Sequence, residues 1–156
     1  MEQVLKQVLD GWSLQIKTAN KVIESLTDEQ LAGDIAPGKN SGVYLLGHLV
    51  TVHDGVLPLI GLGDKIFPEL ENVFLRSPDK SGLPHPDVQT LRRNWLEINE
   101  KLNEHFAGFS INNWMERHTA VSEEAFANEP HRNKLNILVS RTSHLAYHLG
   151  QIALLK

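Results

Sequence analysis

Four segments of the chain carry apolar residues at alternating spacings of three and four, and this pattern constrains the fold more than any other feature. It is clearest near the N-terminus, at Leu5, Leu9, Trp12, Ile16, Ala19, Ile23 and Leu26. This spacing places every one of these side chains on the same face of an α-helix. Such a helix needs a cover for its apolar face, so we expect these helices to pack against one another.

The other three segments repeat the pattern further along the chain. The second begins at Ser41, a residue type favoured immediately before a helix, and Pro58 ends or bends it. The third runs from about Asp87 to Phe106 and the fourth from about Arg132 to Leu155. No apolar alternation of the kind found in strands stands out between them.

Long connections follow the second and third helical segments. One extends from about Gly61 to Pro86, and the other, which is polar, from about Ala120 to His131. A connection of about 25 residues can run the length of a bundle, so helices that follow one another need not be antiparallel. We predict an all-α fold, a four-helix bundle with a long crossover connection, formed by a single domain of residues 1–156.

Composition argues against several classes of function. The formal net charge is −4, from 15 Lys and Arg against 19 Asp and Glu, so a basic surface for nucleic acid is missing. No apolar run approaches the roughly 18 residues of a membrane span, and the first residues lack the apolar core of a signal peptide. The absence of cysteine removes disulfides, thiolate ligands and a cysteine nucleophile. We expect a cytoplasmic protein with no nucleic-acid or membrane partner.

Two histidines four residues apart, His144 and His148, stand in the fourth helical segment. This spacing puts both on one helix face, where two imidazoles can bind one metal ion. His48, at the edge of the apolar stripe of the second helix, is the candidate third ligand. Three histidines with an open fourth position are typical of a catalytic metal site. The other interpretation is a polar core in which the histidines are hydrogen-bonded and bind nothing.

The remaining histidines are weaker candidates. His53 is about 140° from His48 around a straight helix, so the two cannot bind the same ion. We expect His53 and Asp54 to face solvent or the rim of the site. Surface positions are also expected for the histidines in or near loops and helix ends, His85, His105, His118 and His131.

Two polar residues lie close to the candidate ligands in the sequence. Gln151 follows His148 by three residues, and it either donates a hydrogen bond to a ligand, lines the pocket or packs against a loop. Tyr44 lies one turn before His48, from which its hydroxyl could serve as a proton donor at the open position. Both are candidate catalytic residues.

Charged residues are harder to assign. Arg141, three residues before His144, either binds an anionic substrate or forms a surface ion pair, and the ion pair is the simpler expectation. No carboxylate can be assigned as a general base. The candidates by proximity of helices are Asp54, Glu97 and Glu100, and each is more simply an exposed helix charge.

Two motifs and a turn resemble the DinB-like superfamily. The motifs are Ser41-x-x-x-Leu45-Leu46-Gly47-His48-Leu49 and His144-x-x-x-His148-x-Gly150-Gln151-Ile152. The turn is Leu26–Leu31, in which Thr27 and Gln30 form a capping box. The resemblance spans nearly the whole chain in order and spacing. One departure is Leu149, where many members have arginine, so an anion contact from that position is not implied here.

This resemblance implies a four-helix bundle that forms a homodimer and binds a divalent metal ion, zinc, nickel or iron, through His48, His144 and His148. Assigned activities in the family often use a low-molecular-weight thiol such as bacillithiol, mycothiol or glutathione. We therefore expect a metal-dependent thiol S-transferase, or a related hydrolase, acting on a small-molecule substrate. The alternatives are a non-catalytic bundle protein that binds a metal or small ligand, and a purely structural dimer.

Overall fold

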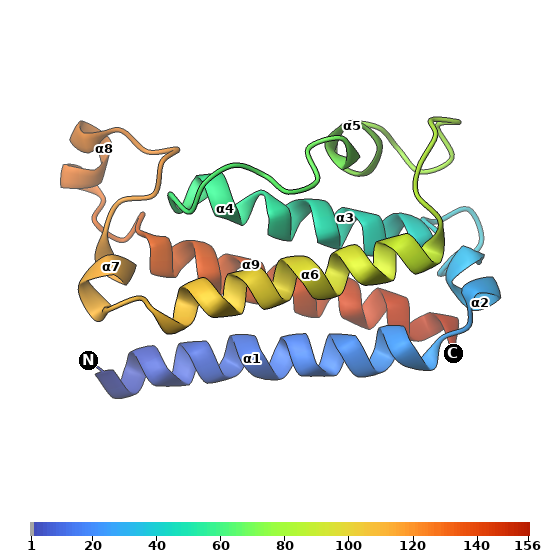
Figure 1. Cartoon of the computed structure of the whole chain (residues 1–156), viewed down its shortest axis with the longest axis horizontal. Coiled ribbons are helices and arrows are strands. Elements are labelled where there is room, and N and C mark those ends of the chain that lie inside the picture. The colour runs from blue at the N-terminus through green and yellow to red at the C-terminus, as the bar shows by residue number, and fades with distance from the viewer. Residues whose placement is uncertain (1) are drawn as a thin grey trace.

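The computed structural model describes residues 2–156, and the predicted all-α class is confirmed for them, since they contain helices and only isolated β-bridges. Four long helices lie side by side (Figure 1). They are α1 (Glu2–Ser25), α3 (Gly42–Asp54), α6 (Val88–Ala107) and α9 (Lys134–Ile152). Each corresponds to one of the four apolar stripes. None of these helices combines the length and apolar composition that a membrane crossing requires.

The long helices run in two directions. Figure 1 shows α1 and α9 running one way and α3 and α6 the other. Because α3 and α6 are parallel, the connection between them must return along the length of the molecule, as the length of this segment predicts. This crossover (residues 55–87) carries two short helices, α4 (Val56–Leu59) and α5 (Leu70–Phe74).

One feature of α3 sets it apart from the other long helices: it is buried on almost every side. Leu45, Leu46, Leu49 and Val50 are each 1% exposed or less. Its closest packing is against α6, while α5 of the crossover and α9 cover other parts of its surface. A helix that is apolar around its whole circumference belongs in a core. The second of the four long helices, α3, therefore belongs to the core on more than one face.

The helices begin where the sequence predicts. The side-chain oxygens of Ser41, Asp87 and Asn133 accept hydrogen bonds from backbone N–H groups one turn into α3, α6 and α9. Such caps satisfy donors that have no partner within the helix. The capping box of Thr27 and Gln30 is also present and opens α2 (Asp28–Ala32).

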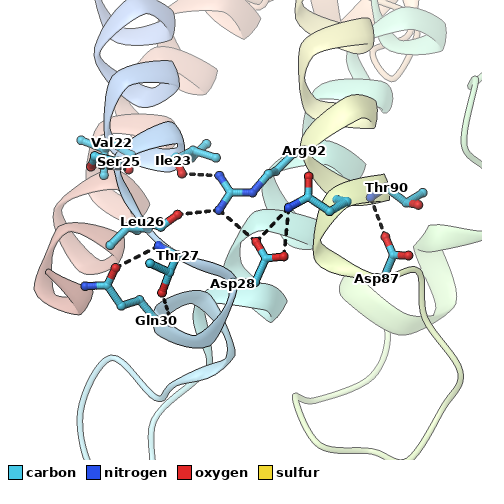
Figure 2. Close-up of polar contacts among 11 residues, drawn as sticks. Val22, Ile23, Ser25, Leu26, Thr27, Asp28, Gln30, Asp87, Thr90 and Arg92 are labelled. Carbon is cyan, nitrogen blue, oxygen red and sulfur yellow. Dashed lines mark hydrogen bonds and ion pairs between the residues drawn. The ribbon is translucent and has the colours of Figure 1, made fainter.

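Arg92 ties the end of α1 to α6 (Figure 2). Its guanidinium donates to the backbone carbonyls of Ile23 and Leu26 and lies 3.4 Å from the Asp28 carboxylate. The amide of Gln89 donates to the same carboxylate. The carbonyl of Ile23 in the last turn of α1 and that of Leu26 just beyond it thus find donors on a neighbouring helix, which fixes the turn into α2.

The connection between α6 and α9 is more ordered than the sequence predicts. It contains α7 (Ile111–Met115) and also α8 (Glu123–Asn128) within the segment expected to be only polar linker. Ser122 caps α8, and Glu123 and Glu124 in its first turn suit the positive end of the helix dipole. Trp114 of α7 is fully buried. This segment therefore closes one end of the core.

Candidate metal centre

Three histidines from two helices meet where α3 packs against α9. Nε2 of His144 lies 3.3 Å from Nε2 of His48 and 3.1 Å from Nε2 of His148. All three side chains are partly buried, and their ligand atoms lie within 4.8 Å of one another. Among residues 2–156 this is the only group of three or more potential ligand side chains with that closeness. The structure thus brings together the three candidate ligands named from the sequence.

Hydrogen bonds at the far side of two rings fix which nitrogen faces the centre. Nδ1 of His48 lies 2.8 Å from the backbone oxygen of Phe74, and Nδ1 of His148 lies 2.7 Å from Oε1 of Gln151. A carbonyl oxygen only accepts, so each Nδ1 carries the proton and each Nε2 presents a lone pair. Nδ1 of His144 is buried and has no partner within the described part of the chain.

Burial keeps two of these imidazoles neutral. It lowers the pKa of His144 to about 4, and the neighbouring His148 and His48 act in the same direction. Burial also lowers the pKa of His148, against the opposing effect of its bond to Gln151. The neutral imidazole is the form that binds a metal ion, so protons compete weakly at neutral pH.

The donor set fits a divalent ion. Tetrahedral zinc, with Zn–N bonds of about 2.0–2.1 Å, requires ligand nitrogens about 3.3–3.4 Å apart. The two measured Nε2 separations, 3.3 and 3.1 Å, are close to that value. Imidazole ligands suit zinc, nickel, copper and iron and not magnesium or calcium, which prefer oxygen. The Nε2 atoms of His48 and His148, whose lone pairs are left free by the bonds at Nδ1, both lie next to Nε2 of His144.

The crossover supplies part of this site through its backbone. The ring of Phe74 in α5 lies against Gly47 of α3, which brings the Phe74 carbonyl within reach of His48. Asp54, at the other end of α3, accepts from the backbone N–H groups of Ile66 (2.7 Å) and Phe67 (2.9 Å). The crossover is thereby fixed to α3 at His48 itself and at the C-terminal end of the helix. Sequence reasoning missed the Phe74 carbonyl, because every residue has one.

The expectation that His53 and Asp54 face solvent is wrong. Both are 0% exposed. The ring of His53 packs between Trp12 and Trp95, with centroid distances of 5.1 and 4.9 Å, and its Nδ1 lies 2.8 Å from Oδ1 of Asn99. Burial lowers the pKa of His53 to about 3. Both residues are buried because α3 is covered on two opposite faces.

Of the three carboxylates considered as a general base, Asp54 is occupied by the two backbone N–H groups of the crossover. It is buried and so is not the exposed helix charge that was expected. Glu97 and Glu100 are exposed on α6, as expected. None of the three belongs to the histidine group.

Tyr44 and Gln151 both contact groups next to the site. The Tyr44 hydroxyl donates to the backbone oxygen of Ser77 at 2.7 Å, on the crossover. Burial, with the nearby Asp79, raises the pKa of this phenol. Gln151 bonds His148 through its amide oxygen, so among the alternatives left open it contacts a ligand histidine, as acceptor and not as donor. Catalytic roles for both residues stay predictions.

A pocket of about 260 Å³ lies beside the histidines. Its lining includes His48, His144, Thr51, Lys65, Leu75 and Arg141. Arg141 is partly buried there and forms no ion pair within residues 2–156, so the expected surface ion pair is wrong. Burial lowers the pKa of Arg141. Residues 141 and 144 share a face of α9, and Lys65 and Leu75 of the crossover complete the pocket next to that face.

The four remaining histidines lie away from this group. His85 and His131 are exposed and His105 is partly buried. His118 is only 8% exposed, contrary to expectation. The backbone N–H of Thr119 donates to the carbonyl of Leu59 at 2.9 Å, which holds this segment against the end of α4.

A match to a known family covers most of the chain. A family model described as the DinB superfamily matches residues 12–152. That match contains all three histidines, the crossover and Gln151. A search of curated proteins found no significant match to the chain.

Proposed function

Because the chain belongs to the DinB superfamily, we propose that it is a metal-dependent enzyme in which His48, His144 and His148 hold one divalent ion. One observation carries this proposal: three Nε2 atoms converge, and hydrogen bonds on the opposite nitrogens of His48 and His148 direct their lone pairs inward. Zinc and nickel are the ions we favour, with iron as a third candidate.

When bound, such an ion supplies a Lewis acid that lowers the pKa of a coordinated water or thiol towards about 7. The chain itself holds the ligands in position. The Phe74 carbonyl orients His48, and Gln151 orients His148. The adjoining pocket gives a small molecule access to two of the three histidines. Gln151 is thus a positioning residue. Tyr44 would act as proton donor only if its hydroxyl left Ser77.

We propose thiol S-transfer as the reaction, with a low-molecular-weight thiol as one substrate. The thiol loses its proton to solvent, and its sulfur forms a bond to an electrophilic carbon. The leaving group departs from that carbon with the bonding electron pair. A hydrolase would use water in place of the thiol at the same site. Support for the thiol comes from the family resemblance and from the small size of the pocket.

Elemental analysis of untagged, dialysed protein tests the metal site. We expect about one zinc, nickel or iron per chain, and its loss in His48→Ala, His144→Ala and His148→Ala with the helical content unchanged. His131→Ala is the matched control, because His131 is exposed and outside the group. Unchanged metal content in all three ligand variants would refute the assignment.

Turnover then separates catalysis from binding. Metal-loaded protein is assayed with a panel of thiols and alkylating electrophiles, and we expect a rate that disappears in the ligand variants. A stoichiometric metal without turnover across the panel would indicate a non-catalytic metal-binding protein.

We also propose that the protein is a homodimer. Large apolar side chains are exposed on α9, at Val139 (43%) and Tyr147 (64%), and on the 3-10 turn Ala153–Leu155 that follows it, at Leu154 (67%). The spacing of eight residues between Val139 and Tyr147 places these two on the same side of α9. Sedimentation analysis should give the mass of two chains for the native protein and of one chain for Tyr147→Lys. A native monomer would refute this proposal.

A further inference from the structure

We infer that the pocket beside His48 and His144 selects small ligands that carry a carboxylate, and that Arg141 recognises this group. The inference rests on the proposed function, because it specifies which thiols the metal site would accept. It assigns to Arg141 a role in specificity.

The charged side chains that line the pocket are all positive. Its charged lining residues, apart from the histidines, are Lys65 and Arg141, and no acidic side chain lines it. Val52 and Leu75 make part of the wall apolar. An anion entering this pocket meets two cations in a partly desolvated space, where attraction between charges is stronger than in water.

The two cations differ in what they already bind. Lys65 forms an ion pair with Glu71, which also binds Arg76. Arg141 has no hydrogen-bond or ion-pair partner within residues 2–156, and its Nε atom is buried. A buried charged donor without a partner costs free energy, which an anionic ligand would recover. Arg141 is therefore the cation available to a ligand.

The position of Arg141 suits recognition of a carboxylate next to the metal site. It precedes His144 by three residues on α9, so the two side chains leave the same helix face. The planar guanidinium offers parallel N–H donors that match the two oxygens of a carboxylate. We therefore expect the sulfur of the ligand to face the histidines and its carboxylate to face Arg141.

The size of the pocket limits what fits. At about 260 Å³ it is just smaller than the roughly 300–1,000 Å³ of sites for drug-sized ligands. It accommodates a short thiol acid, or the thiol-bearing end of a longer one.

A matched pair of thiols tests the inference. Protein loaded with Co²⁺ is titrated with 3-mercaptopropionate and, separately, with its uncharged amide, 3-mercaptopropanamide. Binding is followed by the visible and near-ultraviolet bands of Co²⁺. We expect the acid to bind about ten- to a hundredfold more tightly, as for a hydrogen-bonded ion pair.

Three variants locate the source of this preference. In Arg141→Gln the preference should fall to about onefold with Co²⁺ content unchanged, and Arg141→Lys should retain part of it. Arg76→Gln is the control, because Arg76 is an exposed arginine that binds Glu71 and does not line the pocket. It should leave the preference unchanged. Equal binding of acid and amide by the native protein would overturn the inference while leaving the metal proposal intact.

A second measurement detects the contact between the ligand and Arg141 in metal-free protein. Phenylglyoxal modifies accessible arginines, and mass spectrometry reports the reactivity of each one. In metal-free protein, 3-mercaptopropionate should protect Arg141 and leave Arg76 reactive, whereas the amide should protect neither. Failure to bind Co²⁺ together with protection of Arg141 would refute the proposed function and support the anion pocket. Absence of protection would overturn the inference.

Discussion

The ring of Phe74 lies on Gly47 so closely that a Cβ atom at position 47 would come 2.4 Å from Cε1 of Phe74. Real Cβ atoms do not approach other heavy atoms to that distance, so this contact requires glycine. It allows α5 of the crossover to lie directly on α3, and the Phe74 carbonyl then reaches Nδ1 of His48 at 2.8 Å. Gly47, next to the proposed ligand His48, thus makes room for the Phe74 ring and so allows the Phe74 carbonyl to accept a hydrogen bond from this ligand.

Replacing Gly47 with alanine should therefore damage both the fold and the metal site. We expect the overpacking to cost about 1–3 kcal/mol of unfolding free energy and displacement of the Phe74 carbonyl to weaken metal affinity about 10- to 100-fold. Urea denaturation and competition with a chelator measure the two effects. Gly150→Ala is the control, because nothing lies within 4 Å of the added atom, and it should leave both values unchanged or slightly raise stability. Similar effects at the two positions would contradict the explanation.

The hydrogen bond from His148 to Gln151 leads to a second prediction. Gln151→Leu removes the acceptor 2.7 Å from Nδ1 and should lower metal affinity about 10- to 100-fold. Gln151→Glu retains an acceptor and should retain affinity. Chelator competition measures both. If the leucine and glutamate variants bound the metal equally well, Gln151 would not position the ligand.

Burial of His53 predicts a pH-dependent stability. Its pKa is about 3 in the folded protein, whereas an unfolded chain has a histidine pKa of about 6.5. Between these values the unfolded state binds a proton that the folded state excludes. The unfolding free energy therefore falls as the pH drops below 6.5, by up to about 1.4 kcal/mol per pH unit from this residue. Above pH 6.5 His53 contributes no slope.

Urea denaturation of metal-free protein between pH 7 and pH 5 tests this prediction. His53→Gln keeps a donor for Asn99 but cannot titrate, so its stability should depend less steeply on pH than that of the native protein. Identical slopes for the two proteins would show that His53 is protonated in the folded state.

The buried carboxylate of Asp54 should anchor the crossover. Asp54→Ala leaves the N–H groups of Ile66 and Phe67 without their acceptor, and we expect a loss of roughly 1.5–3 kcal/mol. Hydrogen exchange should accelerate at these two amides, while the amide of Thr90, capped by Asp87, serves as the unaffected reference. Unchanged exchange at residues 66 and 67 would contradict this role.

The sequence predicts the features that depend on local geometry. The periodicity of apolar residues locates all four long helices, because one face of each must be covered. Ser41 and Asp87 mark helix starts through the chemistry of capping. His144 and His148 can be paired by counting residues on a helix, and the three histidines do meet.

Features that depend on the path of the crossover are not predictable in this way. His53 is buried because α3 is covered on opposite faces, and helical periodicity indicates only one buried face per helix. Arg141 lines the pocket because the crossover brings Lys65 and Leu75 to the same place. The segment that contains these residues has no periodicity from which its course could be derived.

The contact between His48 and the backbone oxygen of Phe74 has a consequence for genetics. A side-chain substitution at position 74 leaves that oxygen in the chain, so a scan of point mutations would not reveal this acceptor directly. Its importance would show instead at Gly47 and Asp54, which fix the course of the backbone. A substitution at position 74 acts on the bond to His48 only through the packing of the side chain on Gly47, which holds the crossover in its path.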